Sequence, residues 1–227
     1  MSLKPALWYT LYKLAELGAY YNFSEISSTK LAKELSVSQQ TASKRLISLE
    51  EEGYIERKIS PRGSLIKIME KGVNELRRVY VNLQLLSGGP PIEITFEGKV
   101  FKGLGEGAYY VSLKGYRSQF MEKLGFVPYP GTLNLKLSAT SLMRRKELLS
   151  YPAIEIKGFK NGKRTYGLVK CFPAVICDKV NGAVILIDRT HYDDTVLELI
   201  APVNLRETLK LNDGDKIKVQ INISKKL

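Results

Sequence analysis

Apolar residues recur at helical spacing through the first third of the chain. One stripe consists of four leucines three or four residues apart, Leu7, Leu11, Leu14 and Leu17. This stripe predicts a helix over about residues 4–17 that buries one face. Ser28 is placed to cap a second helix, and Ser38 to cap a third that ends at Gly53. Because only SVS joins the second and third helices, we expect a helix-turn-helix unit.

The third helix has one apolar and one polar face. Ala42, Leu46 and Leu49 share the face that should be buried. The opposite face and its edges carry polar residues, among them Gln39, Gln40, Thr41, Ser43 and Lys44. Amide and hydroxyl groups bind base edges and Lys neutralises phosphates, so the mixture is typical of a recognition helix. A merely solvated face, or a contact with another protein, explains the same residues.

Two short β-like runs, YIERKI and LIKIM, follow this helix and enclose the turn SPRGS. The turn would project Arg62 as a wing. Residues 4–86 therefore resemble the winged helix-turn-helix domains of bacterial and archaeal transcription regulators. The resemblance implies double-stranded DNA as a partner.

A linker is expected at SGGPP, residues 87–91, because its prolines cannot continue the helical pattern that runs to Leu86. The linker divides the chain into a winged-helix domain, residues 1–86, and a second domain, residues 92–227. In the second domain short β-rich runs alternate with turns, and only two segments favour helices. The chain thus changes architecture at the linker.

A glycine-rich segment, GLGEGAYYVSL, follows the first predicted strand of the second domain. Without Cβ atoms, Gly103, Gly105 and Gly107 let backbone N–H groups approach an anion closely. The segment also fits G-x-G-x-x-A, but a dinucleotide fingerprint opens a helix, and the following YYV favours a strand. Nor is there a P-loop, since GFKNGKR predicts a hairpin turn at Asn161-Gly162.

The segment FVPYPGTLNLKLS carries a second candidate site. If Thr132–Leu137 is a strand, its two-residue period puts three leucines on one face and Thr132, Asn134 and Lys136 on the other. A hydroxyl, an amide oxygen and an ammonium in a row suit Mg²⁺ together with a phosphate. A strand with a solvated outer face accounts for these residues equally well.

Further elements complete the prediction for the second domain. Short strands are expected over Ala153–Ile156, Thr165–Lys170, Ala174–Ile176 and Ala183–Ile187, with a last one after the turn LNDGD. A helix capped by Ser138 or Thr140 should expose Arg144, Arg145 and Lys146. Because helices do not intervene between most strands, we expect a small closed or nearly closed β-barrel. The fold class is α+β with two domains.

Composition narrows the function classes. The 227 residues are 44% hydrophobic and 26% charged, as in folded globular proteins, and the formal charge of +12 favours nucleic acid or nucleotide phosphates as partners. No apolar run reaches the roughly 20 residues of a membrane helix, and the first residues lack the features of a secretory signal. We therefore expect a cytoplasmic protein without a membrane partner. Cys171 and Cys177 should be buried thiols.

Three segments together resemble one enzyme family: GLGEGAYYVSL, GFVPYPGTLNLKL and RTHYDDTVLELIAPVNLRETLKLNDGD, in that order. The region from about Pro91 to Ile223 is similar to the archaeal CTP-dependent riboflavin kinases, some of which carry a winged helix in front. The resemblance implies a cradle-loop β-barrel and transfer of phosphate from CTP to the 5′-hydroxyl of riboflavin, giving FMN and CDP. It also implies Mg²⁺ as cofactor.

The resemblance assigns residues to each ligand. The nucleotide falls to Gly103, Leu104, Gly105, Glu106, Gly107 and Ala108, and to Val203, Asn204, Leu205 and Arg206. Thr132 and Asn134 would hold Mg²⁺, and Thr190 and Glu198 would contact the flavin. Ala108 stands where such proteins often carry a basic residue, which bears on one phosphate contact and leaves the backbone cradle intact. Glu198 is the first candidate for a general base, ahead of Asp193, Asp194 and the single histidine, His191.

Two other hypotheses stay open at this point. The second domain could sense a ligand without turning it over, which would make the chain a transcription regulator only. The winged helix could serve as an interaction or dimerisation module, and a homodimer is one assembly that the sequence allows. Formation of FMN separates the first alternative from the kinase, and the strength and salt dependence of DNA binding tests the second.

Overall fold

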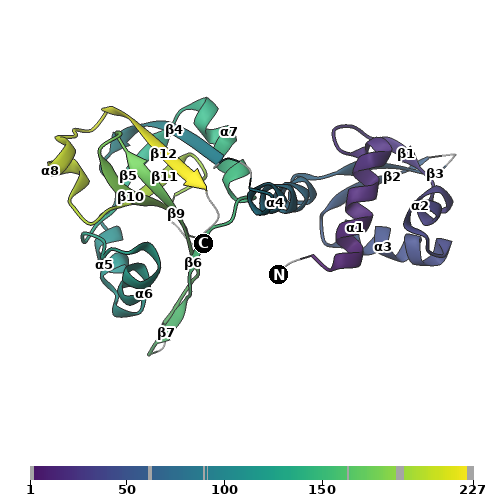
Figure 1. Cartoon of the computed structure of the whole chain (residues 1–227), viewed down its shortest axis with the longest axis horizontal. Coiled ribbons are helices and arrows are strands. Elements are labelled where there is room, and N and C mark those ends of the chain that lie inside the picture. Colours follow the sequence, from purple (N-terminus) through teal and green to yellow (C-terminus); the bar gives the residue numbers. More distant parts are fainter. Residues whose placement is uncertain are drawn as a thin grey trace. The chain divides into compact units, whose positions relative to one another are not determined.

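The computed structural model describes residues 3–60, 63–88, 90, 92–162, 164–187 and 192–223. The chain divides into an N-terminal unit, Met1–Gln84, and a C-terminal unit, Leu85–Leu227. Each unit has its own secondary structure and its own buried core (Figure 1). Among the described residues, no helix combines the length and the apolar character that a membrane span requires.

The N-terminal unit is a small helical domain with a three-stranded antiparallel sheet of order β1-β3-β2. Its elements are α1 (Pro5–Leu14), the π-helical turn η1 (Ala15–Ala19), β1 (Ser24–Ile26), α2 (Ser28–Leu35), α3 (Gln39–Glu51), β2 (Ile55–Ser60), β3 (Gly63–Ile68) and α4 (Glu70–Leu86). Strands β2 and β3 pair antiparallel and form the wing expected from the sequence. The winged-helix prediction is therefore confirmed.

Local signals placed the helices of this unit well. Ala42, Leu46 and Leu49 are buried, and the Ser38 hydroxyl accepts a hydrogen bond from the Thr41 N–H at the start of α3. The cap predicted for α2 was wrong by one residue, because the Ser27 hydroxyl accepts from the Lys30 N–H and leaves Ser28 inside the helix. Helix α1 also stops earlier than the leucine stripe suggests, at Leu14, where the chain passes into the π-helical turn.

The C-terminal unit is built on a closed antiparallel β-barrel. Its elements are β4 (Ile92–Phe101), α5 (Gly107–Ser112), α6 (Lys114–Leu124), β5 (Leu133–Leu137), α7 (Ala139–Leu148), β6 (Ile154–Ile156), β7 (Phe159–Asn161), β8 (Arg164–Tyr166), β9 (Val169–Ile176), β10 (Val180–Ile187), β11 (Val196–Ile200), α8 (Leu205–Leu209) and β12 (Lys216–Ile223). Six strands follow the order β10-β11-β5-β4-β12-β9, and the pairing of β9 with β10 closes the ring. The predicted small barrel is confirmed.

The barrel has an apolar interior and a second core outside it. Phe96, Leu135 and Val219 are buried on the inward face of their strands. Outside the barrel, Val111 of α5 and Phe120 of α6 pack in a cluster with residues of β9, β10 and β11. Figure 1 shows α5 and α6 together on one side of the barrel, next to β6 and β7. This outer cluster places the two helices over one sheet face.

Three details of the second domain differ from the sequence prediction. The glycine loop is followed by helix α5, because the YYV segment packs Val111 into the outer cluster and this burial outweighs its β propensity. Thr165–Lys170 is not one strand, since β8 ends at Tyr166 and β9 begins at Val169. Among the described residues the unit has four helices rather than two, although α5 and α8 are short.

Two smaller outcomes concern the helix after β5 and the thiols. Ser138 caps α7 by accepting from the Ser141 N–H, as predicted. Arg144 and Lys146 are exposed, but Arg145 is not, because its guanidinium turns to form an ion pair with Asp194. Cys171 is buried, and burial raises its pKa to about 12, so this thiol stays protonated at neutral pH. Cys177 is only half-buried, because it lies in the turn after β9, so the prediction of a buried thiol was wrong there.

Candidate functional site

A polar row crosses the outer face of the barrel. Asn134 of β5 lies opposite Phe101 of β4 on one side and opposite Glu198 of β11 on the other, and Glu198 in turn lies opposite Ile185 of β10. Residues opposite each other in antiparallel strands share a face, so the four side chains form one row. We call it the polar row after its two central residues, Asn134 and Glu198. The alternate residues, such as Leu135, are buried in the barrel interior. The two faces predicted for β5 are therefore both present.

The glycine loop lies directly against this row. A Cβ atom on Gly107 would stand 2.5 Å from Thr132 Oγ1, and one on Gly103 would stand 2.0 Å from Asn134 Nδ2. Gly105 has a φ of +82°, in the left-handed region that favours glycine. These three positions thus require glycine, two for close approach and one for backbone conformation.

Tyr192 holds the loop in place from the other side. Its hydroxyl accepts a hydrogen bond of 2.9 Å from the Leu104 N–H, and its ring meets Phe101 edge to face. Sequence reasoning passed over Tyr192 because it lies in the cluster RTHYDD, among titratable neighbours that are stronger candidates for catalysis. Tyr192 therefore joins the described segment before β11 to the glycine loop.

Oxygen atoms converge where the loop meets the row. The Thr132 hydroxyl lies 3.4 Å from Asn134 Oδ1 and 3.4 Å from Glu198 Oε1. Asn134 is only 6% exposed, which is unusual for an amide side chain. In the part of the chain that the structure describes, no three His, Cys, Asp or Glu side chains gather as a metal site. Neutral oxygens and one carboxylate therefore make up the available donor set.

A cavity of about 280 Å³ opens beside these oxygens. Its polar side consists of residues 104–107 of the glycine loop together with Thr132, Asn134, Tyr192 and Glu198. Its aromatic side consists of Tyr110, Val111, Tyr116, Phe120, residues 164–167, Val169, Ile185 and Ile187. One cavity thus joins a cluster of hydrogen-bonding groups to an apolar and aromatic wall.

Arg164 of the β7–β8 hairpin lies over the aromatic side. Its guanidinium carbon is 5.5 Å from the centre of the Tyr166 ring, and Nη2 donates to the Tyr110 hydroxyl at 2.9 Å. Among the lining residues that the structure describes, Arg164 is the single cation, in a cavity that also holds the carboxylates of Glu106 and Glu198. A planar cation on aromatic rings is held by cation–π attraction and shaped to recognise planar polar ligands.

The tyrosines of this side are fixed by their hydroxyl groups. The Tyr116 hydroxyl donates to the Gly167 carbonyl at 2.6 Å, and the Tyr109 and Tyr166 hydroxyls lie 2.9 Å apart. The bond to Tyr109 raises the pKa of Tyr166, and burial raises the pKa of Tyr116, so both phenols are neutral at physiological pH. No local sequence motif predicts that these residues lie together, because they come into contact only through the packing of α5, α6 and the β7–β8 hairpin.

Several predicted site residues lie elsewhere. Lys136 shares the face of Asn134 but does not line the cavity, and its ammonium bonds the Thr195 hydroxyl, so its contact with a phosphate stays a prediction. The segment from Val203 to Arg206 starts α8 and is not part of the cavity lining. Gly103 and Ala108 flank the lining residues of the loop.

Other candidates have structural partners or fall outside the description. Asp193 accepts hydrogen bonds from the Thr195 N–H and hydroxyl, which lower its pKa, and Asp194 pairs with Arg145. Of the candidate bases that the structure describes, Glu198 is the one that lines the cavity. Thr190, His191 and Arg62 lie outside the described residues.

The exposed side of α3 carries the predicted polar residues. Gln39, Gln40 and Lys44 are exposed, whereas Thr41 and Ser43 are half-buried. Two of these residues already contribute to the fold, because Gln39 Nε2 donates to the Ser28 hydroxyl at 3.0 Å and the Thr41 hydroxyl lies 2.9 Å from that of Ser38. Gln40, Ser43 and Lys44 are therefore the residues of this helix best placed to meet a partner.

Comparison with protein families gives two matches. The model of the CTP-dependent riboflavin kinase family, described as domain of unknown function DUF120, matches residues 100–221. The model of the MarR family matches residues 7–62. The first match covers the glycine loop and the polar row, and the second covers α3 and most of the wing.

Curated proteins match nearly the whole chain. A riboflavin kinase of Methanosarcina barkeri is 47% identical over 212 residues, which is 93% of both chains. A riboflavin kinase of Archaeoglobus fulgidus is 43% identical over 208 residues, 92% of this chain and 88% of that one. Among solved structures, the transcription regulator MepR of Staphylococcus aureus covers 38% of this chain and 65% of its own, at 20% identity and a TM-score of 0.31, which is too low to carry an argument.

Proposed function

The chain belongs to the CTP-dependent riboflavin kinase family, and from this premise we propose that it transfers the γ-phosphate of CTP to the 5′-hydroxyl of riboflavin. The observation that carries the proposal is the cavity, in which the glycine loop and three oxygen-bearing side chains face an aromatic wall. The glycine loop and the oxygen-bearing side chains suit a triphosphate, and the aromatic wall suits a tricyclic ring. The reaction is a phosphotransfer to an alcohol, with FMN and CDP as products.

The polar side would bind the triphosphate and Mg²⁺. Thr132 Oγ1 and Asn134 Oδ1 suit the ion, because Mg²⁺ prefers hard oxygen ligands and both atoms lie beside the Glu198 carboxylate. Backbone N–H groups of the loop from Gly103 to Gly107 would neutralise phosphate oxygens, as close approach without side chains permits. Bound Mg²⁺ would supply further neutralisation of charge on the phosphate oxygens.

Glu198 would position the acceptor. Its carboxylate lies at the junction of the two sides, opposite both Asn134 and Ile185 in the sheet. There it can accept a hydrogen bond from the 5′-hydroxyl and take up its proton as the bond from that oxygen to the γ-phosphorus forms and the bond to CDP breaks. Phosphoryl transfer makes little demand on a base, so orientation is the larger contribution of this residue.

The aromatic side would hold the isoalloxazine ring. Tyr110, Tyr166 and Phe120 offer ring faces and edges, and Arg164 can donate to the carbonyl oxygens of the pyrimidine part. The flexible ribityl chain then spans the cavity toward Glu198. This arrangement would keep the ring away from the triphosphate while it brings the terminal hydroxyl to the glycine loop.

The remaining family positions complete the proposal. Thr190 would contact the flavin, and Val203, Leu205 and Arg206 would contact the cytidine nucleotide along with Asn204. The Asn204 side chain already caps α8 by accepting from the Arg206 and Glu207 N–H groups, and Arg206 pairs with Asp213 at 2.7 Å. Backbone groups of this segment are therefore its available contacts to a base.

The N-terminal unit would bind double-stranded DNA. Its MarR-family match and the exposed amide, hydroxyl and ammonium groups of Gln40, Ser43 and Lys44 support a recognition helix in the major groove. Gln39 and Thr41 would help to fix the start of that helix, and Arg62 would add a contact from the wing. Binding that is weak and indifferent to sequence would contradict this role.

The kinase is tested by incubating the purified chain with riboflavin, Mg²⁺ and each of the four nucleoside triphosphates. Formation of FMN with CTP as the best donor is the expected result. Binding of riboflavin without any FMN would instead favour a regulator that senses its ligand. Omission of Mg²⁺ by chelation should stop turnover and be reversed by adding the ion back.

A further inference from the structure

A row of three lysines crosses the outer face of the barrel, two residues along the strands from the polar row. Lys136 of β5 lies opposite Lys99 of β4, and Lys99 lies opposite Lys216 of β12. Strands β5, β4 and β12 are neighbours in the sheet, so the three side chains are adjacent on one face. We call them the lysine row.

This register places like charges opposite each other, which lowers the stability of the barrel on its own. Side chains directly opposite in antiparallel strands have Cβ atoms about 5 Å apart, and like charges at that distance are destabilising. Lys99, Lys136 and Lys216 are all exposed. Among the described residues no carboxylate forms an ion pair with Lys99 or Lys216, whereas Lys218 nearby is 3.9 Å from Asp178. Lys136 already contacts the Thr195 hydroxyl, so the charges of Lys99 and Lys216 are the ones left to be balanced by something outside the chain.

The surroundings favour an extended anion over a single phosphate. The row lines an open groove of about 480 Å³ together with Glu97, Ser138 and Lys218. A site for one phosphate needs converging donors, but the Ser138 hydroxyl is engaged in capping α7, and the strands spend their N–H groups on their ladders. Three charges spread over two strand spacings, about 10 Å, suit a polyanion.

From this geometry we propose that the lysine row binds the phosphate backbone of double-stranded DNA, as a contact additional to the winged helix. Each DNA strand places one phosphate about every 3.4 Å along the axis, so a span of about 10 Å meets about three phosphates of one strand. DNA is chosen over other polyanions because the same chain carries a unit of the MarR family. That choice rests on the DNA-binding role proposed above.

The test is the salt dependence of DNA binding by the full chain. A labelled duplex of mixed sequence, about 30 base pairs long, is titrated by fluorescence anisotropy at salt concentrations from about 50 to about 300 mM. The variant K99Q/K216Q should lower the slope of log affinity against log salt by about 2, because each phosphate that a lysine neutralises adds about 0.9 to that slope. Affinity at the lowest salt should fall by about tenfold.

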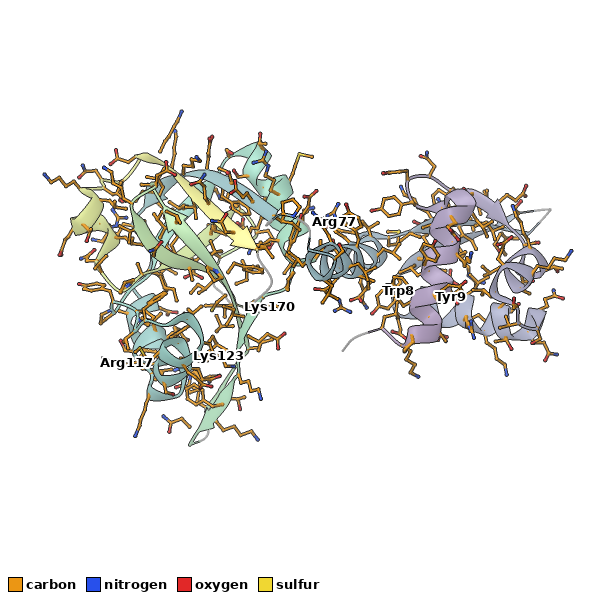
Figure 2. All side chains as sticks on the ribbon, viewed as in Figure 1. Trp8, Tyr9, Arg77, Arg117, Lys123 and Lys170 are labelled. Atoms are coloured by element: carbon orange, nitrogen blue, oxygen red, sulfur yellow. The ribbon has the colours of Figure 1, made fainter. Side chains whose placement is uncertain are left out.

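The matched control removes the same charge from another part of the barrel. Lys114 and Arg117 are exposed on α6, where Arg117 is labelled in Figure 2, and K114Q/R117Q should leave the slope unchanged. Thermal unfolding checks the fold of the test variant, whose melting temperature should not fall, since the substitutions remove like-charge pairs.

Four results would overturn the inference. An unchanged slope in K99Q/K216Q would remove the lysine row from the DNA interface, and an equal reduction of the slope in the control would reduce the effect to net charge. A slope change seen with duplex RNA but not with DNA would assign the row to RNA. If the wild-type chain failed to bind this duplex at the lowest salt concentration, the inference would fail. The role of the winged helix is tested separately, by the preference of the wild-type chain among duplexes of different sequence, so the two proposals are separable.

Discussion

The two sides of the cavity are built in different ways. The polar side comes from one strand row and a loop whose glycines touch it, so that Gly103 and Gly107 fit against Asn134 and Thr132 with no space for a Cβ. The aromatic side comes from α5, α6 and the β7–β8 hairpin, which meet only through packing. The groups proposed to bind Mg²⁺ and the acceptor thus lie on the barrel strands, while the wall proposed for the flavin ring comes from elements packed outside the barrel.

If this division is right, substitutions on the polar side should lower the turnover number and those on the aromatic side should raise the KM for riboflavin. The largest effect is expected for Asn134→Ala. It removes a buried amide oxygen beside Thr132 and Glu198 and with it a proposed ligand of Mg²⁺. The kcat for FMN formation should fall by about 10²-fold or more at saturating Mg²⁺.

The matched control for this substitution is Asn222→Ala, an exposed asparagine of β12 outside the cavity. It should retain the turnover of the wild-type chain. Near wild-type turnover of Asn134→Ala at saturating Mg²⁺ would refute the role of this side chain as a ligand.

The next largest effect is expected for Gly107→Ala. Its Cβ would meet Thr132 Oγ1 at 2.5 Å, so the loop must move away from the row, and the kcat/KM for CTP should fall by roughly tenfold to 100-fold. Gly167→Ala, on the aromatic side of the cavity, is the control for this constant and should leave the kcat/KM for CTP unchanged, since a Cβ at Gly167 meets no atom within 4 Å and its φ is not positive. Equal activities of the two variants would show that close approach of the loop is unimportant.

A smaller and different effect is expected for Tyr166→Leu. Loss of the ring removes a stacking face and the support for Arg164, so the KM for riboflavin should rise by about tenfold, with the KM for CTP nearly unchanged. Tyr166→Phe keeps the ring and should stay within about threefold of the wild-type chain. A rise in the KM for CTP instead would place the nucleotide base on the aromatic side.

The smallest effect is expected on stability, from the contact between Asp193 and Thr195 just before β11. Hydrogen bonds from Thr195 favour the charged form of Asp193 and lower its pKa from 3.8. This stabilisation is present above the unfolded-state pKa and is lost as the pH falls through the lower folded-state value. Thr195→Val should therefore lower the melting temperature slightly at neutral pH, and the difference from the wild-type chain should shrink as the pH falls below the ordinary Asp pKa of 3.8.

Thr195→Val also frees Lys136, so it tests whether that lysine belongs to the phosphate site. Kinetic constants for CTP should stay close to those of the wild-type chain. A clear change in the KM for CTP would show that Lys136 contributes to the phosphate site once its bond to Thr195 is removed.

Prediction from the sequence succeeded where the signals are local. The cap at Ser38, the stripe of Ala42, Leu46 and Leu49, and the two faces of β5 depend on residues a few positions apart. The polar side was therefore predictable, apart from Lys136, whose partner Thr195 lies 59 residues away. The identity of the ligands came from the family resemblance, because the periodicity of apolar residues carries no information about ligands.

The aromatic side was not predictable because its contacts are long-range. The helix α5 forms against the β propensity of its residues, and Arg164 reaches Tyr110 across 54 positions of the chain. Burial of Val111 and Phe120 on the outer face of the barrel decides both features. Where side chains from three elements converge, packing free energy outweighs local preference, and a single sequence does not reveal the result.

A crystal structure of the full chain with Mg²⁺, CDP and FMN would test the central claim most directly. We expect the isoalloxazine ring between Tyr110, Tyr166 and Arg164, the ion on Thr132 and Asn134, and the diphosphate along residues 103–107. A flavin ring stacked elsewhere, with the cytosine base against Tyr166, would contradict the division of the cavity into a reacting side and a ring-binding side.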